Sequence, residues 1–400
     1  MHPARSNISV VTLAVLCALL LTGARAVRAQ TETVLWNFCS VGNCSDGIGP
    51  GGLTSDGAGN FYGMTVRGGE YDGGTAFELS PNGSGGWNET VLWNFNGADG
   101  VFPSGSLIFD SLGNIYGTTF TGGANGYGVV FELSPTGASW TETVLYNFCS
   151  QKGCPDGANP VNGLIMDPAG NLYGTTTFGS SIGVFELSPS GGGWTYQVIY
   201  TVVDPVGLTT DAAGNILGAS DYNVFELSPN GSGGWNPTVI YTFAGAPKDG
   251  YGAQGVPVLD QAGNLYGTTY SGGTKNYGTV YKLSPITKGK KKGQWNEKIL
   301  HSFRSSKDGA NPSAGVVLDA AGNIYGTTYY GGKSGVGTVF ELMAPAGTDK
   351  YYKEKVLWTF NGSDGMLPYG NPILDSAGNL YGTANEGGSY NAGVVFEVTP

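Results

Sequence analysis

Short runs in which apolar and polar residues alternate fill most of this chain, and clusters rich in glycine separate them. Residues 32–38 (ETVLWNF) form one such run, and alternation of this kind is typical of a β-strand with one buried face. Closely related runs return six more times, at residues 91–95, 144–148, 198–202, 239–243, 299–303 and 356–360. The pattern therefore predicts many short strands in a repeating order.

A second element of the pattern, Asp-x-x-Gly-Asn-x-Tyr-Gly, occurs seven times with small variations, 44 to 59 residues apart. A period of this length is the signature of a repeat architecture. We predict that each motif forms a tight hairpin, in which the aspartate accepts backbone N–H bonds and Gly-Asn supplies the positive φ. These structural turn residues are Asp56, Asp110, Asp167, Asp211, Asp260, Asp319 and Asp375.

Each repeat predicts four strands joined by hairpins. The first strand is a short apolar segment before the motif, and the second is the segment Asn-x-Tyr-Gly-Thr-Thr. The third strand, Val-Phe-Glu-Leu-Ser-Pro, follows a Gly-rich loop, and the alternating run described first is the fourth strand. Such units arranged radially are β-propeller blades. The chain begins with a fourth strand and ends with a third, residues 395–398, so pairing of these strands would close the ring. The predicted fold class is all-β, one seven-bladed propeller of four-stranded antiparallel blades over residues 30–400, closed by the N-terminal strand.

The combined repeat resembles the GloVer tandem repeat proteins, which are exported bacterial repeat proteins. The resemblance rests on Asp-x-x-Gly-Asn-hydrophobic-Tyr-Gly-Thr-Thr, then Gly-Gly, then Val-Phe-Glu-Leu-Ser-Pro, nearly whole at residues 110–135, 260–285 and 319–342. It covers residues 31–400 and implies an exported, propeller-like array, with no catalytic residues to carry over. The Ser-x-Asp-x-Gly-x-Thr-Trp box of sialidases is missing from the chain.

The composition and the N-terminal segment indicate where in the cell the protein is located. The chain of 400 residues has 70 glycines and only 12% charged residues, whereas about 25% is usual. Residues 1–29 contain Arg5, an apolar run at 9–21 and small residues up to Ala29, which is the organisation of a secretory signal peptide. We therefore predict a leader at 1–29 and a protein that is secreted or held at the cell surface. No later apolar segment approaches the ~20 residues of a membrane-spanning helix.

Charge limits the partners. Removal of residues 1–29 takes away Arg5, Arg25 and Arg28 and no acidic side chain, which leaves 16 basic and 30 acidic residues and a formal charge of −14. Such a surface repels phosphate backbones, so we expect no nucleic-acid partner. The basic run at 288–292 lies in the turn of one repeat and is interpreted as a solvated loop tip. We expect a monomer without a cofactor, whose partner is an extracellular polysaccharide or protein.

Four cysteines follow the leader, and they occupy equivalent loops of two repeats. Each pair follows Asn-Phe and precedes Asp-Gly, and an exported protein favours local disulfides between such neighbours. The predicted disulfide residues are Cys39, Cys44, Cys149 and Cys154. A four-cysteine metal site would require loops of different repeats to meet, and no metal site is predicted.

Candidate catalytic chemistry is sparse. His301 is the one histidine after the leader, and it stands where equivalent strands carry Trp or Tyr, so we interpret it as a packing residue. A multi-histidine metal site is thereby excluded. The acids that break the repeat, and so are the weak catalytic alternative for a glycosidase or lyase, are Glu70, Asp72, Asp221 and Glu386. Calcium binding by Asp and Asn oxygens lacks an EF-hand or nonapeptide spacing.

The loop between the second and third strands opens on the same face as the connection to the next blade. The motif hairpins lie on the opposite face. The first, here called the variable-loop face, collects tyrosines and amides that suit sugar rings or peptides. The candidate ligand-binding residues are Tyr71, Tyr127, Tyr222, Tyr270, Tyr277, Tyr329, Tyr330 and Asn385. We favour a non-enzymatic binding protein, with a carbohydrate-active enzyme and a structural cell-surface module as the alternatives.

Overall fold

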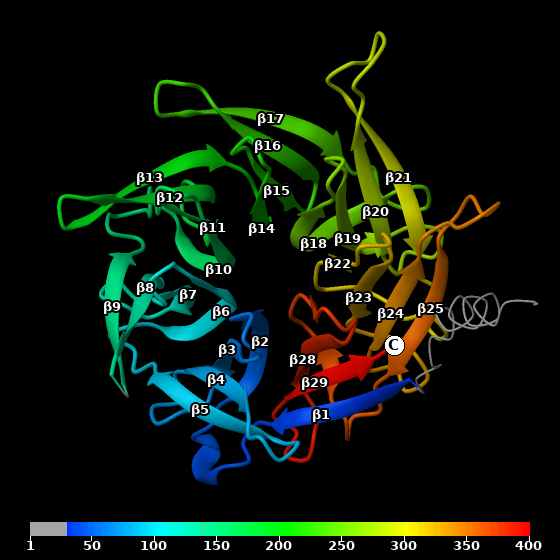
Figure 1. The fold of residues 1–400 in the computed structure, drawn as a ribbon. Coiled ribbons are helices and arrows are strands. Elements are labelled where there is room, and N and C mark those ends of the chain that lie inside the picture. Colours follow the sequence, from blue (N-terminus) through cyan, green and yellow to red (C-terminus); the bar gives the residue numbers. More distant parts are fainter. Residues whose placement is uncertain (1–29, 138) are drawn as a thin grey trace, which may run out of the picture.

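The alternating runs form strands that assemble into seven sheets, the blades, arranged in a ring (Figure 1). This computed structural model describes residues 30–137 and 139–400, so the predicted leader at 1–29 lies outside the described residues. Six blades have four antiparallel strands each, and the seventh has its first strand in two pieces. The first strand of each blade lies nearest the ring axis and the fourth lies outermost (Figure 1).

The strands follow one another along the chain in blade order. Blades one to three comprise β2 (Ile48–Ser55), β3 (Phe61–Arg67), β4 (Thr75–Pro81), β5 (Trp87–Asn94); β6 (Val101–Phe109), β7 (Ile115–Thr121), β8 (Val129–Thr136), β9 (Ser139–Asn147); and β10 (Ala158–Met166), β11 (Leu172–Phe178), β12 (Gly183–Ser190), β13 (Gly193–Thr201). Blades four and five comprise β14 (Pro205–Thr210), β15 (Ile216–Ser220), β16 (Asn223–Pro229), β17 (Trp235–Thr242); and β18 (Gly250–Leu259), β19 (Leu265–Gly272), β20 (Thr279–Pro285), β21 (Trp295–Ser302). Blades six and seven comprise β22 (Val317–Leu318), β23 (Ile324–Thr328), β24 (Thr338–Met343), β25 (Lys353–Thr359); and β26 (Met366–Pro368), β27 (Ile373–Leu374), β28 (Leu380–Glu386), β29 (Val394–Thr399) with β1 (Thr31–Asn37).

The N-terminal strand closes the ring, as the sequence predicted. β1 pairs antiparallel with β29, from Thr31 opposite Thr399 to Asn37 opposite Val394. Figure 1 shows this blue and red pair completing blade seven beside blade one. The N-terminal strand β1 is the outermost strand of the blade whose other strands come from the C-terminal end. No strand of either terminus is therefore left without a partner where the ring closes.

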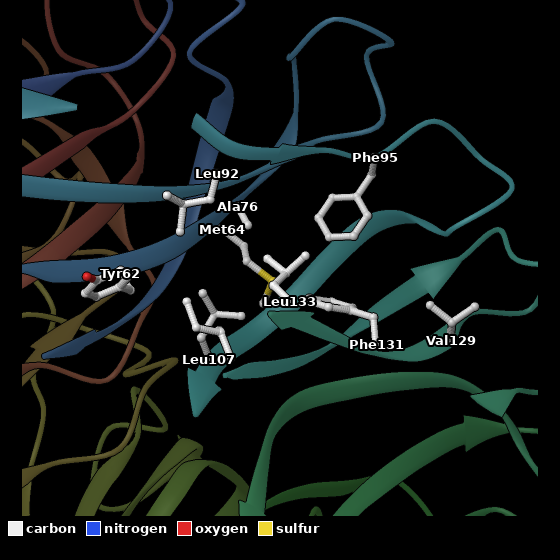
Figure 2. Packing of buried hydrophobic residues seen from close by; sticks show 10 residues of the cluster. Tyr62, Met64, Ala76, Leu92, Phe95, Leu107, Val129, Phe131 and Leu133 are labelled. Carbon is white, nitrogen blue, oxygen red and sulfur yellow. The ribbon is translucent and has the colours of Figure 1, made fainter. Parts of the chain in front are cut away.

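The hydrophobic core lies between successive blades. Figure 2 shows the junction of blades one and two, where Met64 and Leu92 meet Leu107 and Leu133, all buried. Burial of a side chain of this size contributes roughly 1.5–3 kcal/mol. Seven such clusters, one for each junction, distribute the core around the ring.

A repeated ring contact explains the glycine that follows the motif tyrosine. Phe95, after the fourth strand of blade one, packs edge-to-face on Phe131 in the third strand of blade two, with centroids 5.1 Å apart (Figure 2). A Cβ on Gly117 would lie 2.6 Å from Cζ of Phe131, so only glycine leaves room for that ring. Equivalent pairs with centroids 5.0 to 5.2 Å apart are Phe38–Phe77, Phe148–Phe185, Phe243–Tyr281, Phe303–Phe340 and Phe360–Phe396.

The motif aspartate holds its hairpin together with four hydrogen bonds. Oδ1 of Asp110 accepts from the backbone N–H groups of Leu112 (2.8 Å) and Asn114 (2.9 Å). Oδ2 accepts from Nδ2 of Asn114 (2.8 Å) and from the Tyr116 hydroxyl (3.2 Å). Partial burial alone would raise the pKa of Asp110, but these hydrogen bonds outweigh it and hold the pKa below its usual value. The same four bonds recur at Asp167, Asp260, Asp319 and Asp375.

One detail of the predicted hairpin is wrong. The motif glycine has the expected positive φ, 86° at Gly113, but Asn114 is not among the residues with positive φ. The asparagine instead uses its side-chain amide to bond the aspartate, because the glycine alone supplies the left-handed conformation that the turn requires.

The predicted first strand of blade six is shorter than expected. A short apolar strand is predicted before each motif, but here β22 contains only Val317 and Leu318. The backbone N–H of Gly315 donates instead to Oδ1 of Asn371, 2.6 Å away on blade seven. A bond to a side chain of the next blade replaces the ladder bond at that point.

Both predicted disulfides are present. Cys39 is bonded to Cys44 and Cys149 to Cys154, each closing the loop that leads into the next blade. In the first loop a one-turn 3₁₀ helix, η1 (Gly42–Cys44), lies within the bridged segment. Within residues 30–137 and 139–400, no helix has the length and apolar character needed to cross a bilayer.

Candidate binding site

The end of the second strand places one residue of each blade at the rim of the variable-loop face. This is the residue after the Thr-Thr pair or its counterpart, and it is followed by the loop to the third strand. The rim residues of the seven blades in order are Val66, Phe120, Thr177, Asp221, Tyr270, Tyr329 and Asn385. Because the motif hairpins close the other end of the same strands, this rim and the hairpins lie on opposite faces, as expected.

Two adjoining pockets open at this rim, and five blades contribute to them. One has a volume of about 340 Å³ and the other about 390 Å³, and Tyr329 and Tyr369 line both. We call the two together the axial site, because their walls include residues of the innermost strands β2, β6, β18 and β26 or of the segments that follow or replace them. The first pocket is lined by Gln254, Tyr270, Ser313, Tyr329 and Tyr369, and the second by Gly51, Val66, Arg67, Phe102, Pro103, Ser104, Gly105, Phe120, Tyr329, Tyr369 and Asn385.

Tyrosines supply the wall that the two pockets share. Tyr369 lies at the position after the proline of the first strand, where blades one, two and six have Gly51, Ser104 and Ser313. It is 50% exposed, so a large ring reaches from the strand end into the site. The ring of Tyr329 packs edge-to-face on Tyr330, with centroids 4.7 Å apart. The site therefore presents aromatic surface that a neighbouring ring holds in place.

The rim backbone is fixed by asparagine side chains of the following blade. Nδ2 of Asn159 donates to the carbonyl of Phe120 (2.8 Å), and Nδ2 of Asn311 donates to the carbonyl of Tyr270 (2.9 Å). These bonds connect the end of the second strand in one blade to the segment that begins the next blade. The side chains at the rim are thus mounted on a braced backbone.

Arg67 and Phe102 form another part of the wall of the larger pocket. The guanidinium carbon of Arg67 lies 5.4 Å from the centroid of the Phe102 ring, a cation–π contact. Phe102 has a φ of 55°, in the left-handed region that bulky residues avoid. The equivalent residues of the other six blades also have positive φ, and they are Gly49, Asn159, Asp204, Gly252, Asn311 and Leu367. Glycine and asparagine suit this conformation, so Phe102 occupies a position at which an aromatic side chain is strained.

The structure brings together only part of the predicted binding set. Tyr270, Tyr329 and Asn385 line the axial site, and Tyr330 supports Tyr329. Tyr71, Tyr127, Tyr222 and Tyr277 do not line it. Tyr127 stacks parallel to Phe178 and Tyr222 contacts Tyr251 edge-on, so both lie at other blade junctions of the same face. Gln254, Phe102 and Tyr369 line the site and were not found from the sequence.

None of the described contacts joins one of the four candidate catalytic acids to another. Asp72 accepts a hydrogen bond from the backbone N–H of Gly68 (3.0 Å) and so caps its own loop. Glu70 bonds the neighbouring Tyr71, and Glu386 lies at the end of β28. Burial, followed by the nearby Tyr330 and Glu386, raises the pKa of Tyr329. Burial, followed by the nearby Asp204 carboxylate, raises the pKa of Asp221. None of the four lines the axial site.

A larger groove of about 1080 Å³ lies on the motif-hairpin face. It is bordered by the hairpins of blades two, three and four, and its polar groups include Asp110, Asp167 and Asp211. Both carboxylate oxygens of Asp110 and Asp167 already accept two hydrogen bonds each within their hairpins. Polar groups committed to folding are poorly suited to reading a ligand, so we favour the axial site despite its smaller volume.

His301 occupies the packing position that the sequence indicated. Its side chain is 15% exposed and its Nε2 lies 3.1 Å from Oδ2 of Asp308 at a blade junction. Among residues 30–137 and 139–400, no three or more His, Cys, Asp and Glu residues are grouped so that they hold a metal ion.

Seven antiparallel blades closed by strands from both termini define the chain as a seven-bladed β-propeller. A family model described as the Gloeobacter/Verrucomicrobia repeat matches residues 26–223 and 207–400. The chain belongs to this family, which confirms the resemblance read from its repeats. A comparison with curated proteins gave no match.

Solved structures share the fold at low sequence identity. A streptogramin B lyase is 16% identical with a TM-score of 0.57, covering 92% of this chain and 97% of its own. A virginiamycin B lyase from Staphylococcus aureus, determined with quinupristin, is 15% identical with a TM-score of 0.58, covering 93% of this chain and 99% of its own. At this identity the likeness shows the propeller architecture alone.

Proposed function

We propose that this protein is an exported, non-enzymatic propeller that binds a carbohydrate at the axial site. The observation that carries the proposal is the convergence of Tyr270, Tyr329, Tyr369 and Asn385, from three blades, on two adjoining pockets. Tyrosine rings stack on the apolar faces of sugar rings, while amide and hydroxyl groups bond sugar hydroxyls. The pockets have the size of small-ligand sites, and they lie on loops and strand ends of a rigid ring.

Export is part of the proposal and rests on two features. Residues 1–29 have the organisation of a signal peptide, and the described chain contains two disulfide bonds, which persist in oxidising compartments. Both features support a protein that meets polysaccharide outside the cytoplasm. Detection of the chain in the culture medium or surface fraction, cleaved near Ala29, is the corresponding test.

A non-catalytic role is favoured by what surrounds the candidate acids and the histidine. The virginiamycin B lyase structure is that of a catalytically inactive variant in which a histidine is replaced by alanine. His301, the one histidine after the leader, bonds Asp308 at a blade junction and lines neither axial pocket. The candidate acid whose pKa burial and a neighbouring carboxylate raise, Asp221, lies beside Asp204 and lines neither axial pocket.

The experiment is a polysaccharide pull-down and glycan-array measurement on the purified protein. Tyr329→Ala and Tyr270→Ala should each weaken binding at least tenfold, because each removes an aromatic surface whose burial contributes about 1.5–3 kcal/mol. Tyr390→Ala is the matched control, since Tyr390 is exposed but lines neither pocket. Binding that survives both site substitutions would refute the axial site. Polysaccharide turnover that is lost in Asp221→Asn would favour the carbohydrate-active enzyme instead.

A further inference from the structure

The axial site has a charge opposite to that of the protein around it. The chain after residue 29 carries 30 acidic and 16 basic side chains, yet none of the acids lines either axial pocket. Arg67 is the one charged residue among those that line the two pockets. A single positive group in an acidic protein, placed among tyrosines and an amide, marks a place where a negative charge on the ligand is favoured.

Arg67 is also available to a ligand. None of the ion pairs in the described part of the chain involves it, and its side chain is exposed. The Phe102 ring orients the guanidinium through a cation–π contact without neutralising its charge. A guanidinium presents parallel N–H donors whose spacing matches the two oxygens of a carboxylate.

The aromatic ring of Phe102 is the second observation that points to this wall of the site. Residues other than glycine, asparagine and aspartate are disfavoured in the left-handed region. At the same backbone position blades one, three, five and six use glycine or asparagine, whereas blade two places an aromatic ring there, beneath Arg67. Blade seven has the bulky Leu367 in the same conformation, so the left-handed backbone belongs to the repeat. What is particular to blade two is an aromatic ring that contacts Arg67, the one charged residue that lines the site.

We propose that the carbohydrate bound at the axial site is acidic, and that Arg67 binds the carboxylate of a uronic acid residue. The inference rests on the proposed function, because it names the class of sugar that the same site takes. The single positive charge matches a monoanionic carboxylate better than a dianionic phosphate. The carboxylate lies over Phe102 beside Asn385, and the sugar rings lie against Tyr329 and Tyr369, which border the same pocket.

The test compares two ligands that differ only in the carboxylate. The full-length purified protein is titrated with polygalacturonate and with carboxyl-reduced polygalacturonate, and also with dextran and dextran sulfate. We expect polygalacturonate to bind at least tenfold more tightly than its reduced form. Arg67→Gln should abolish that difference, Arg67→Lys should retain part of it, and added salt should reduce it. Phe102→Asn, which keeps a residue suited to the backbone conformation, should weaken polygalacturonate binding.

Controls separate the possible outcomes. Arg304→Gln removes an exposed arginine that lines neither pocket and should leave binding unchanged, and thermal unfolding shows that each variant is folded. Equal binding of both galacturonan forms, unaffected by Arg67→Gln but weakened by Tyr329→Ala, would overturn the acidic-sugar inference and leave the proposed function standing. A preference for dextran sulfate would also overturn it. Absence of binding to any of these polymers and to a neutral-glycan array would overturn both.

Discussion

Nε2 of His301 lies 3.1 Å from Oδ2 of Asp308, and this contact is one case of a bond that recurs around the ring. An aromatic or imidazole ring on the fourth strand bonds the buried aspartate of the loop that leads to the next blade. The other pairs are Trp93–Asp99, Tyr146–Asp156, Tyr241–Asp249 and Trp358–Asp364. Because three ring types serve at the same position, the role of His301 is to hold a blade junction.

Substitution of His301 tests that role. His301→Tyr should be tolerated, since tyrosine makes the same bond in blades two and four through Tyr146 and Tyr241. His301→Phe keeps the ring but leaves buried Asp308 without its side-chain partner, and should lower stability by about 1–3 kcal/mol. Thermal or urea unfolding measures both. Equal stability of the two variants would show that the hydrogen bond does not matter.

The motif aspartates should differ in how much each one stabilises the fold, according to the number of hydrogen bonds that it accepts. Asp167→Ala removes an acceptor of four hydrogen bonds, including one from Tyr173, and should cost about 2 kcal/mol or more. Asp211 accepts only three, because Leu217 stands where other blades have tyrosine. Asp211→Ala should therefore cost less. The midpoints of unfolding of the two variants decide, and the reverse order would refute the assignment.

Glutamates on the fourth strand make the fold more stable at acidic than at alkaline pH. Burial, followed by the charge of Asp46, raises the pKa of Glu89 to about 8. Burial and Asp99 raise that of Glu142 to about 7. Glu32 and Glu297 behave alike, with Asp364 and Asp249 as the second cause, and all four have a buried Oε1 without a hydrogen-bond partner. Each pairs a glutamate of one blade with the loop aspartate that precedes it.

The sign of the pH dependence follows from the raised pKa values. A carboxyl with a higher pKa in the folded chain stabilises the fold fully below its unfolded pKa, 4.5 here, and loses this contribution as pH rises through 7 to 8. The pKa of Asp110 is lowered in the folded chain, so its contribution to stability is present above the unfolded pKa of 3.8 and is lost as the pH falls below that value. The unfolding midpoint should therefore be highest near pH 5 and fall toward pH 8. Glu89→Gln should raise the midpoint at pH 8 and flatten the decline, and an unchanged pH profile would contradict the pairing.

Relief of backbone strain can be separated from ligand binding. Leu367 has a φ of 58° at the position equivalent to Phe102, and asparagine occupies that position in blades three and six. Leu367→Asn should stabilise the protein by about 1 kcal/mol, because asparagine adopts left-handed conformations at lower cost. It should leave polysaccharide binding unchanged, since Leu367 lines neither pocket. A loss of stability would show that the leucine side chain packs more favourably than its backbone strain costs.

The architecture was predictable because its determinants are local and repeated. Each Asp-x-x-Gly-Asn motif specifies its own hairpin, and the phase of the chain, beginning with residues 31–37 and ending with 394–399, specifies the closure. The function of the motif asparagine was misassigned, because a turn residue that favours positive φ also carries an amide able to bond the aspartate.

The candidate site was only partly predictable, because the sequence indicates a face but not a distance from the axis. Tyr329 and Tyr71 both follow a second strand, yet Tyr329 comes at the strand end and lines the site, whereas Tyr71 lies further along its loop and is 57% exposed. Phe102 lies in the first strand of blade two, Tyr369 lies between the two pieces of the first strand of blade seven, and neither was among the predicted binding residues. Their signal was a large residue where equivalent positions have glycine, asparagine or serine.

The measurement that tests the central claim most directly is a crystal structure of the protein soaked with a galacturonate oligosaccharide. The account predicts sugar rings in the axial site against Tyr329 and Tyr369, with a carboxylate on the guanidinium of Arg67. An oligosaccharide bound instead in the groove between the motif hairpins of blades two to four, with the axial site free of sugar, would contradict it.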